Sequence, residues 1–176
     1  MTIPNLITAF RVVLVPVVIM LILREEWAWA FALTALAGVS DGLDGFIARR
    51  FGMCSSLGEV IDPLADKILI VAIYCTLAII GIIPVWLALV VILRDVMIVM
   101  AIAVSWIMAQ PIETKSLFVS KVTTALQIAF VAFVLGGLAF SLEIGGFVEP
   151  FAILVAFFTV MTATLYFLRW HRQPGN

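Results

Sequence analysis

The sequence predicts an all-α integral membrane protein, built as a single bundle of six transmembrane helices. Of its 176 residues, 65% are hydrophobic and only 12% are charged, whereas an ordinary soluble domain is about 45–50% apolar and about 25% charged. A spanning helix needs about 20 residues, so six helices would use about 120. We therefore expect one transmembrane domain over residues 1–176.

The composition also excludes several other classes of protein. A soluble globular protein and a disordered chain are both excluded by the high apolar content. Two cysteines, Cys54 and Cys75, are too few for a secreted disulfide scaffold. The one histidine, His171, argues against a zinc protein. A net charge of −1 provides no basic surface for nucleic acid.

The six helices follow from six apolar runs, which polar or turn-forming clusters separate. The first run ends at Arg24-Glu25-Glu26, the third at Gly81 and the fourth at Gln110-Pro111. A turn over Ser141–Pro150, which contains Gly145-Gly146, precedes the last helix. The expected helices cover about Pro4–Leu23, Trp27–Arg50, Gly58–Ile80, Pro84–Met108, Leu117–Phe140 and Phe151–Trp170.

The distribution of basic residues predicts the orientation in the membrane, because lysine and arginine favour cytoplasmic loops. Six helices put both termini on one side of the membrane. The termini and loops of that side carry Arg49, Arg50, Lys115, Arg169 and Arg172. The opposite loops carry only Arg24 against Glu25, Glu26, Glu143 and Glu149. Both termini are therefore expected in the cytoplasm.

Two pairs of aspartates stand out in this apolar chain. Asp41 and Asp44 are three residues apart on the second helix, about 60° around its axis. Asp62 and Asp66 are four apart on the third helix, about 40° around its axis. Each pair therefore shares a helix face. The turn between these helices can bring four carboxylates together near the cytoplasmic ends of the helices.

Such a cluster is costly unless it binds cations. One acidic residue deep in a bilayer costs about 2.5–3.5 kcal/mol, and like charges held close together repel further. A wet cavity with divalent metal lowers this cost, and ligation by oxygen alone suits Mg²⁺ or Mn²⁺. Four carboxylates suit two ions about 3.5–4 Å apart, an arrangement used for phosphoryl displacement. The alternative is a proton or ion pathway.

The neighbouring residues allow a structural and a functional interpretation. Gly38 and Gly42 form a G-x-x-x-G pattern, which is typical of close helix packing; alternatively, a nucleotide approaches the backbone at Gly42 and Gly45. Arg49 offers a planar fork to phosphate, or it is an interfacial arginine. Ser55 is either a phosphate ligand or a plain loop serine.

The stretch from Asp41 to Asp66 reads D-x-x-D-G-x-x-A-R, then eight residues, then G-x-x-x-D-x-x-x-D. It resembles the signature of the CDP-alcohol phosphatidyltransferase family, with every fixed position filled. The resemblance extends over most of the chain, from Ile3-Pro4-Asn5 to Ser120–Thr124. It implies six helices, a homodimer, two divalent cations and CDP-diacylglycerol as the phosphatidyl donor.

The resemblance also implies roles for individual residues. Metal ligands are expected at Asp41, Asp44, Asp62 and Asp66, and Asp66 is also expected to be the general base. Contacts to CDP-diacylglycerol are expected at Asn5, Gly42, Gly45, Arg49, Ser55 and Gly58.

Arg94-Asp95, near the middle of the fourth helix, indicates a branch of the family. Together with Phe118–Val122 it resembles the eukaryotic-type, CMP-forming cardiolipin synthases, whereas phosphatidylglycerophosphate synthases tend to carry Arg-Glu. A buried ion pair is expected in either a structural or a substrate role. Arg94 and Lys121 are candidate contacts to the acceptor phosphate, although Lys121 could equally be an interfacial lysine.

Three classes of function follow. The favoured one is a membrane enzyme that transfers the phosphatidyl group of CDP-diacylglycerol to phosphatidylglycerol, giving cardiolipin and CMP. A second enzyme, with glycerol 3-phosphate as acceptor, remains open, and a small cation transporter or channel is the alternative class. A purely structural membrane subunit leaves the carboxylates unexplained. We expect the favoured enzyme in a bacterial inner membrane, with its active site facing the cytoplasm.

Overall fold

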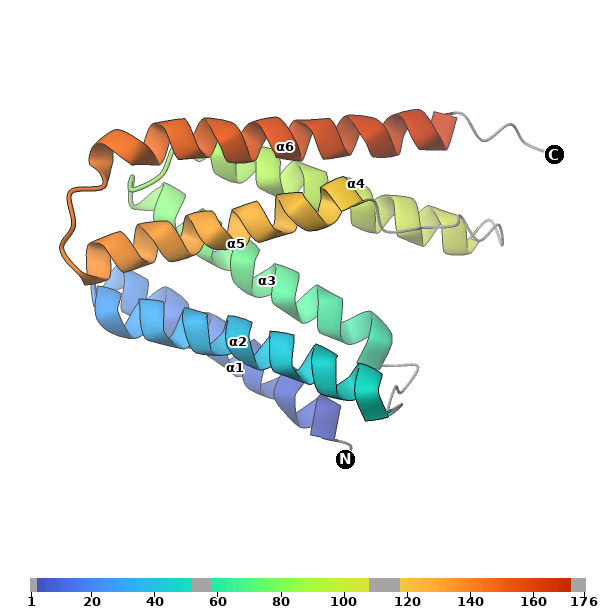
Figure 1. The fold of residues 1–176 in the computed structure, drawn as a ribbon, viewed down its shortest axis with the longest axis horizontal. Helices are drawn as coiled ribbons and strands as arrows, with labels where there is room; N and C mark the ends of the chain where they lie inside the picture. The colour runs from blue at the N-terminus through green and yellow to red at the C-terminus, as the bar shows by residue number, and fades with distance from the viewer. Residues whose placement is uncertain (1–2, 52–57, 108–117, 172–176) are drawn as a thin grey trace. The chain divides into compact units, whose positions relative to one another are not determined.

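The structure, a computed structural model, describes the backbone of residues 3–51, 58–107 and 118–171, and the side chains of residues 13–40, 67–100, 119–166 and 168. The described backbone forms six α-helices and no strand, which confirms the all-α class (Figure 1). The helices are α1 (Ile3–Leu23), α2 (Trp27–Phe51), α3 (Gly58–Ile79), α4 (Val85–Ile107), α5 (Phe118–Ala139) and α6 (Gly145–His171).

The first five helices begin and end within one residue of the boundaries that the sequence predicts. The start of α6 is the exception, because the predicted turn over Ser141–Pro150 is wrong in its second half. α6 begins at Gly145 rather than Phe151 and continues through Pro150. The N–H that proline lacks would have bonded the carbonyl of Gly146, an exposed residue, so water can satisfy that carbonyl.

A short, tightly packed turn allows α6 to start this early. The N–H of Leu142 donates to the carbonyl of Gly137, 2.8 Å away, and closes the end of α5. Ser141 takes a left-handed conformation with φ 53°. Ile144 fills the space beside Gly137, where an added Cβ would lie 2.5 Å from Ile144 Cγ2. The chain has therefore reversed its direction by Ile144, and helix formation can resume at once.

The helices divide into two compact units. The first unit comprises Met1–Ile82 and Val131–Ile144, and the second comprises Ile83–Phe130 and Gly145–Asn176. In the first unit α1 packs against both α2 and α3, and in the second unit α4 packs against α6. α5 is one continuous helix that contributes its first part to the second unit and its last part to the first.

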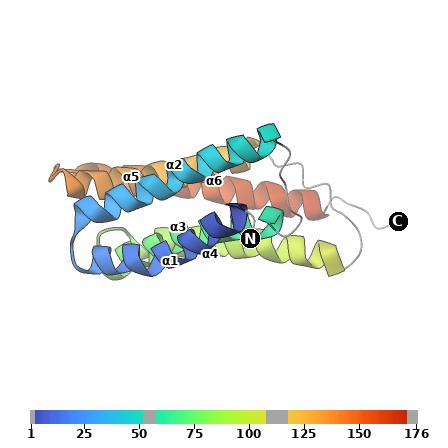
Figure 2. The same cartoon turned by 90° about the horizontal axis from the view of Figure 1, so that it is seen from below.

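Within the first unit, successive helices run in opposite directions. The N-terminal ends of α1 and α3 therefore lie at the same end of this unit as the C-terminal end of α2, as both ribbon views show (Figures 1 and 2). Apolar side chains from α1, α2 and α3 fill the space between these helices. The fully buried ones are Val18, Ile22, Ala30, Ile73, Tyr74 and Leu77.

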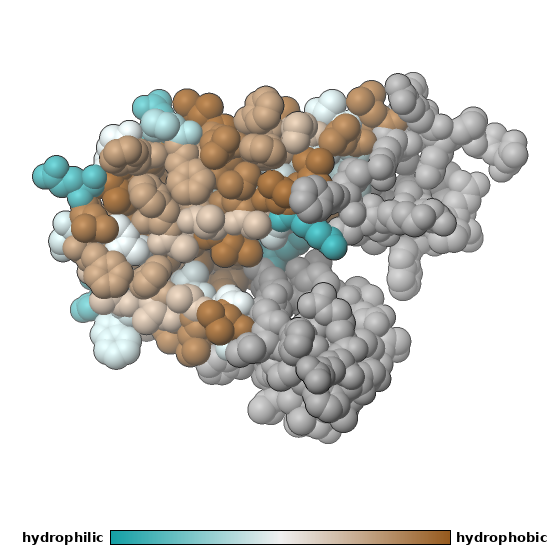
Figure 3. Space-filling model, in the orientation of Figure 1, coloured by the Kyte–Doolittle hydropathy of each residue, from teal (hydrophilic) through white to brown (hydrophobic). Residues whose placement is uncertain are grey.

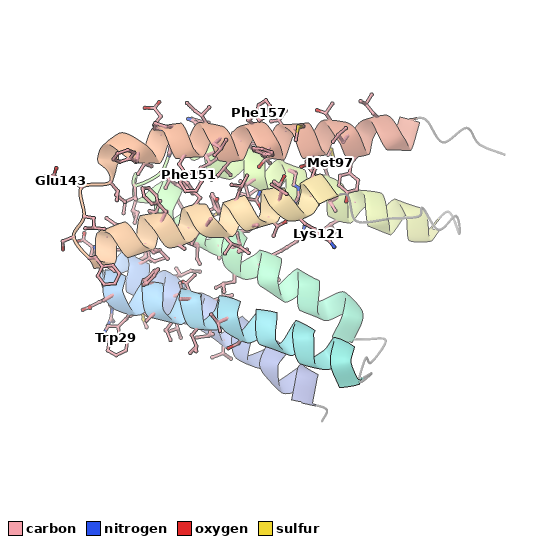
Figure 4. All side chains as sticks on the ribbon, in the orientation of Figure 1. Trp29, Met97, Lys121, Glu143, Phe151 and Phe157 are labelled. Carbon is pink, nitrogen blue, oxygen red and sulfur yellow. The ribbon has the colours of Figure 1, made fainter. Side chains whose placement is uncertain are left out.

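Many large hydrophobic side chains of the described helices are exposed. Figure 3 shows hydrophobic side chains over most of the coloured surface. Trp29 on α2 and Phe157 on α6 point outward (Figure 4), with 64% and 62% of their area exposed. Within the described residues, Val119–Ala139 and Gly145–Tyr166 are long and apolar enough to cross a membrane. An apolar exterior on such helices suits contact with lipid tails.

Candidate functional site

The aspartate motif occupies the facing ends of α2 and α3 in the first unit. Asp41 and Asp44 lie in the last part of α2, and Asp62 and Asp66 in the first part of α3. At a rise of 1.5 Å per residue, Asp44 lies about 10 Å from the end of α2 and Asp62 about 6 Å from the start of α3. The two pairs thus belong to the same end of the unit (Figure 2). Their side chains lie outside the described residues.

The predicted donor contacts that the structure describes are on α1, α2 and α3, the three helices at this end of the first unit. Asn5 lies in the first turn of α1, Gly42, Gly45 and Arg49 lie in α2, and Gly58 begins α3. The backbone therefore places these five residues toward the end of the unit that carries the aspartates. The side chains of Asn5 and Arg49 lie outside the described residues, and Ser55 lies outside them altogether.

The donor set of the motif fits divalent metal by its chemistry. Its four side chains offer only carboxylate oxygens, which Mg²⁺ and Mn²⁺ prefer. Among side chains that the structure describes, no group of three or more His, Cys, Asp or Glu residues could hold a metal ion. The four aspartates are not among those side chains, so their ligand role stays a prediction.

The structure does not support close helix packing at Gly38. A Cβ added there would meet no atom of the described chain within 4 Å, and the residue is exposed. A glycine that packs against another helix is Gly136 of α5, where an added Cβ would lie 3.3 Å from a ring carbon of Phe31 of α2.

A buried arginine defines a second polar site, in the second unit. Arg94 of α4 is only 3% exposed. Its Nη1 donates to Asp95 Oδ1 at 2.6 Å, and its Nη2 donates to Ser120 Oγ of α5 at 2.7 Å. Neighbouring residues of a helix point to different sides, so the long arginine side chain must bend back to reach Asp95. The predicted buried ion pair is confirmed, and it also links α4 to α5.

The Arg94 guanidinium retains hydrogen-bonding capacity. Of its five N–H donors, one bonds Asp95 and one bonds Ser120. Its Nε is buried and has no hydrogen-bond partner within the described part of the chain. Since a buried donor without a partner is costly, this arginine is suited to bind an oxygen anion. Lys121, the next residue after Ser120, is exposed and projects from α5 (Figure 4).

A polar stripe that the sequence did not predict joins α5 to α6 in the second unit. Thr123 Oγ1 lies 2.7 Å from Thr162 Oγ1 and 3.2 Å from the carbonyl oxygen of Phe158. Gln127 Nε2 donates to Thr159 Oγ1 at 3.4 Å. These four side chains are at most 1% exposed. The available signal was the spacing of Ser120, Thr123 and Gln127, which places three polar side chains on one face of an apolar helix.

Comparison with known proteins connects these sites to a family. The family model for CDP-alcohol phosphatidyltransferase matches residues 1–168. The chain therefore belongs to the CDP-alcohol phosphatidyltransferase family, as the aspartate motif predicted.

Individual relatives are similar over nearly the whole chain. A rat protein named cardiolipin synthase (CMP-forming) is 37% identical, and its human counterpart is 36% identical, each over 94% of this chain. A rice chloroplast protein named CDP-diacylglycerol–glycerol-3-phosphate 3-phosphatidyltransferase 1 is 30% identical over 98% of this chain and 58% of its own length. The chain spans about 60% of the length of the rat and human proteins.

Proposed function

We propose that this chain transfers the phosphatidyl group of CDP-diacylglycerol to phosphatidylglycerol, giving cardiolipin and CMP. The observation that carries the proposal is the complete aspartate motif from Asp41 to Asp66, in a chain that belongs to this family. The choice of acceptor rests on the similarity to the two cardiolipin synthases and on the charge of the Arg94 site.

The four aspartates would hold two divalent cations, Mg²⁺ or Mn²⁺. When bound, these cations supply positive charge that stabilises the negative charge on the reacting phosphate. Asn5, Gly42, Gly45, Arg49, Ser55 and Gly58 would bind and orient the cytidine diphosphate part of the donor. An arginine suits this task because its guanidinium can contact two phosphate oxygens at once.

Asp66 would act as the general base. Its carboxylate accepts the proton of the acceptor hydroxyl as the hydroxyl oxygen attacks the β-phosphorus of CDP-diacylglycerol. The new bond joins that oxygen to phosphorus. The bond between the β-phosphorus and the bridging oxygen breaks, and CMP leaves with its electron pair. A positioned base of this kind contributes typically about 10²–10⁴-fold to the rate.

Arg94 and Lys121 would contact the phosphate of the acceptor. Asp95 offsets part of the Arg94 charge through the 2.6 Å ion pair. Such a site suits phosphatidylglycerol, a monoanion, better than glycerol 3-phosphate, which is close to a dianion and calls for more cationic contacts. Phosphatidylglycerol also brings two acyl chains, which an apolar helix surface can accommodate.

Glycerol 3-phosphate is the second candidate acceptor, and the rice relative favours it, because the name of that protein specifies this substrate. The metal ligands and the role of Asp66 would be the same in both reactions. The two reactions differ in their product, which is either cardiolipin or phosphatidylglycerophosphate.

We further propose that the six helices span a bacterial inner membrane as one domain, with both termini and the active site on the cytoplasmic side, and that the protein is a homodimer. The orientation rests on the excess of lysine and arginine in the loops assigned to the cytoplasm. The homodimer rests on the family alone.

The proposed reaction is tested by incubating the purified full chain with CDP-diacylglycerol, phosphatidylglycerol and Mg²⁺ in detergent. We expect release of CMP that requires the acceptor, and loss of this release in Asp41→Asn. Ion flux through liposomes that contain the protein, without any CMP release, would instead support the transporter.

A further inference from the structure

The polar stripe of α5 lies next to the proposed acceptor contacts. Ser120, Thr123 and Gln127 are spaced by three and four residues, so they share one face of the helix. Ser120 contacts Arg94 of α4, while Thr123 contacts Thr162 of α6. One face of α5 therefore contacts α4 through Ser120, near the start of α5, and contacts α6 through Thr123, about one turn later. All of these residues belong to the second unit.

The threonine contacts restrict how α5 can rotate. Each threonine hydroxyl carries one proton, and Thr162 donates its proton to the Phe158 carbonyl of its own helix at 2.8 Å or shares it with Thr123. Both side chains are completely buried. A rotation of α5 would break the contact between Thr123 and Thr162 and the 3.2 Å contact of Thr123 with the Phe158 carbonyl. Each hydroxyl would keep an acceptor in its own helix, the Val119 carbonyl for Thr123 and the Phe158 carbonyl for Thr162. The cost of rotation is therefore the loss of hydrogen bonds between the helices, which favour this helix pairing.

The orientation of Arg94 depends on that rotation. The guanidinium donates hydrogen bonds to two side chains, Asp95 on its own helix and Ser120 on α5. Asp95 alone leaves the plane of the guanidinium free to turn, whereas a second hydrogen bond from Nη2 fixes it. The position of Ser120 Oγ follows the rotation of α5, which Thr123 and Thr162 hold one turn away.

We propose that Ser120 and the Thr123–Thr162 pair are positioning residues that hold Arg94 in the orientation that binds the acceptor phosphate. They act through Arg94 and do not touch the reacting atoms. This inference rests on the proposed function, because it assumes that Arg94 contacts the acceptor. It predicts that loss of these hydroxyls weakens acceptor binding and leaves donor binding unchanged.

The test measures kcat and both KM values with the purified full chain in mixed micelles. Ser120→Ala should raise the KM for phosphatidylglycerol about tenfold, the size expected from losing a hydrogen bond to a charged group. Thr162→Val, which removes the hydroxyl and keeps the shape, should raise it about two- to fivefold. The KM for CDP-diacylglycerol should stay within about twofold in both variants, as a loss confined to the acceptor site requires.

Two further variants separate positioning from general damage. Thr162→Ser keeps the hydroxyl, so it should restore the acceptor KM. Thr164→Val is the matched control, because Thr164 is exposed on α6 and its hydroxyl donates only within the helix, to Val160 at 2.9 Å. If Ser120→Ala does not fold, the inference is tested by the acceptor KM of Thr162→Val and Thr162→Ser alone.

The inference is overturned if both KM values rise in the same proportion, if kcat alone falls, or if Thr164→Val gives the same acceptor defect as Thr162→Val. Each of these comparisons can be made only if the unsubstituted chain is active. An unsubstituted chain that releases no CMP with any acceptor would overturn the proposed function itself, and this inference with it.

Discussion

Gly137 in the last part of α5 is a position where one methyl group should destabilise the protein. A Cβ built there would lie 2.5 Å from Ile144 Cγ2, 2.8 Å from Cδ1 and 3.2 Å from Cγ1. Carbon atoms in contact prefer about 3.5–4.0 Å, and the β-branched Ile144 has few alternative rotamers. Overpacking of this kind costs about 1–3 kcal/mol. The higher helix propensity of alanine returns about 1 kcal/mol, so the expected net loss is up to about 2 kcal/mol.

The assay is thermal unfolding in detergent, followed by tryptophan fluorescence. Gly137→Ala should lower the unfolding midpoint, and adding Ile144→Ala to it should recover part of the loss by removing the clashing atoms. Gly38→Ala is the matched control, because a Cβ there meets nothing within 4 Å in the described chain; it should raise stability by about 0.5–1 kcal/mol. Equal stabilisation by Gly38→Ala and Gly137→Ala would refute the packing of Ile144 against α5.

Three further predictions concern the proposed reaction and its side of the membrane. Exhaustive EDTA treatment should abolish turnover until Mg²⁺ or Mn²⁺ is restored. The variants Asp41→Asn and Asp62→Asn should each lose most activity. Full activity after chelation would contradict the metal site. Asp66→Asn should lower kcat by about 10²–10⁴-fold while donor binding stays measurable; loss of donor binding with unchanged kcat would make Asp66 only a ligand. A cysteine placed beside Glu143 should react with an impermeant thiol reagent from outside the cell. A cysteine beside Glu113, in the loop that the sequence predicts on the cytoplasmic side between the fourth and fifth helices, should not react. The reverse pattern would overturn the orientation.

Most helix boundaries could be predicted because apolar runs and polar breaks are local features of the sequence. The end of α3 is an example: Gly81 adopts φ 79°, a conformation that glycine takes without strain. The predicted start of α6 is wrong, because a proline such as Pro150 is disfavoured inside a helix and the local pattern therefore places the start of the helix after it. The contact of Ile144 with Gly137, which lets the helix begin at Gly145, joins residues whose proximity the local pattern does not reveal.

The two polar sites differ in how far the sequence could define them. The spacing of Asp41, Asp44, Asp62 and Asp66 is itself the signal, so these four candidates could be named without coordinates. Of the two hydrogen-bond partners of Arg94, only one could be predicted. Asp95 is its neighbour in sequence, whereas Ser120 is 26 residues away on another helix. The hydroxyl pairing of Thr123 with Thr162 likewise depends on which helix faces pack together.

The most direct test of the proposed function identifies the product. Labelled CDP-diacylglycerol is incubated with the purified chain and Mg²⁺ in detergent, in one reaction with phosphatidylglycerol and in another with glycerol 3-phosphate, and the lipids are separated by chromatography. We expect labelled cardiolipin, formed only in the reaction with phosphatidylglycerol. Labelled phosphatidylglycerophosphate as the dominant product would contradict the proposed acceptor and assign the chain to the second reaction.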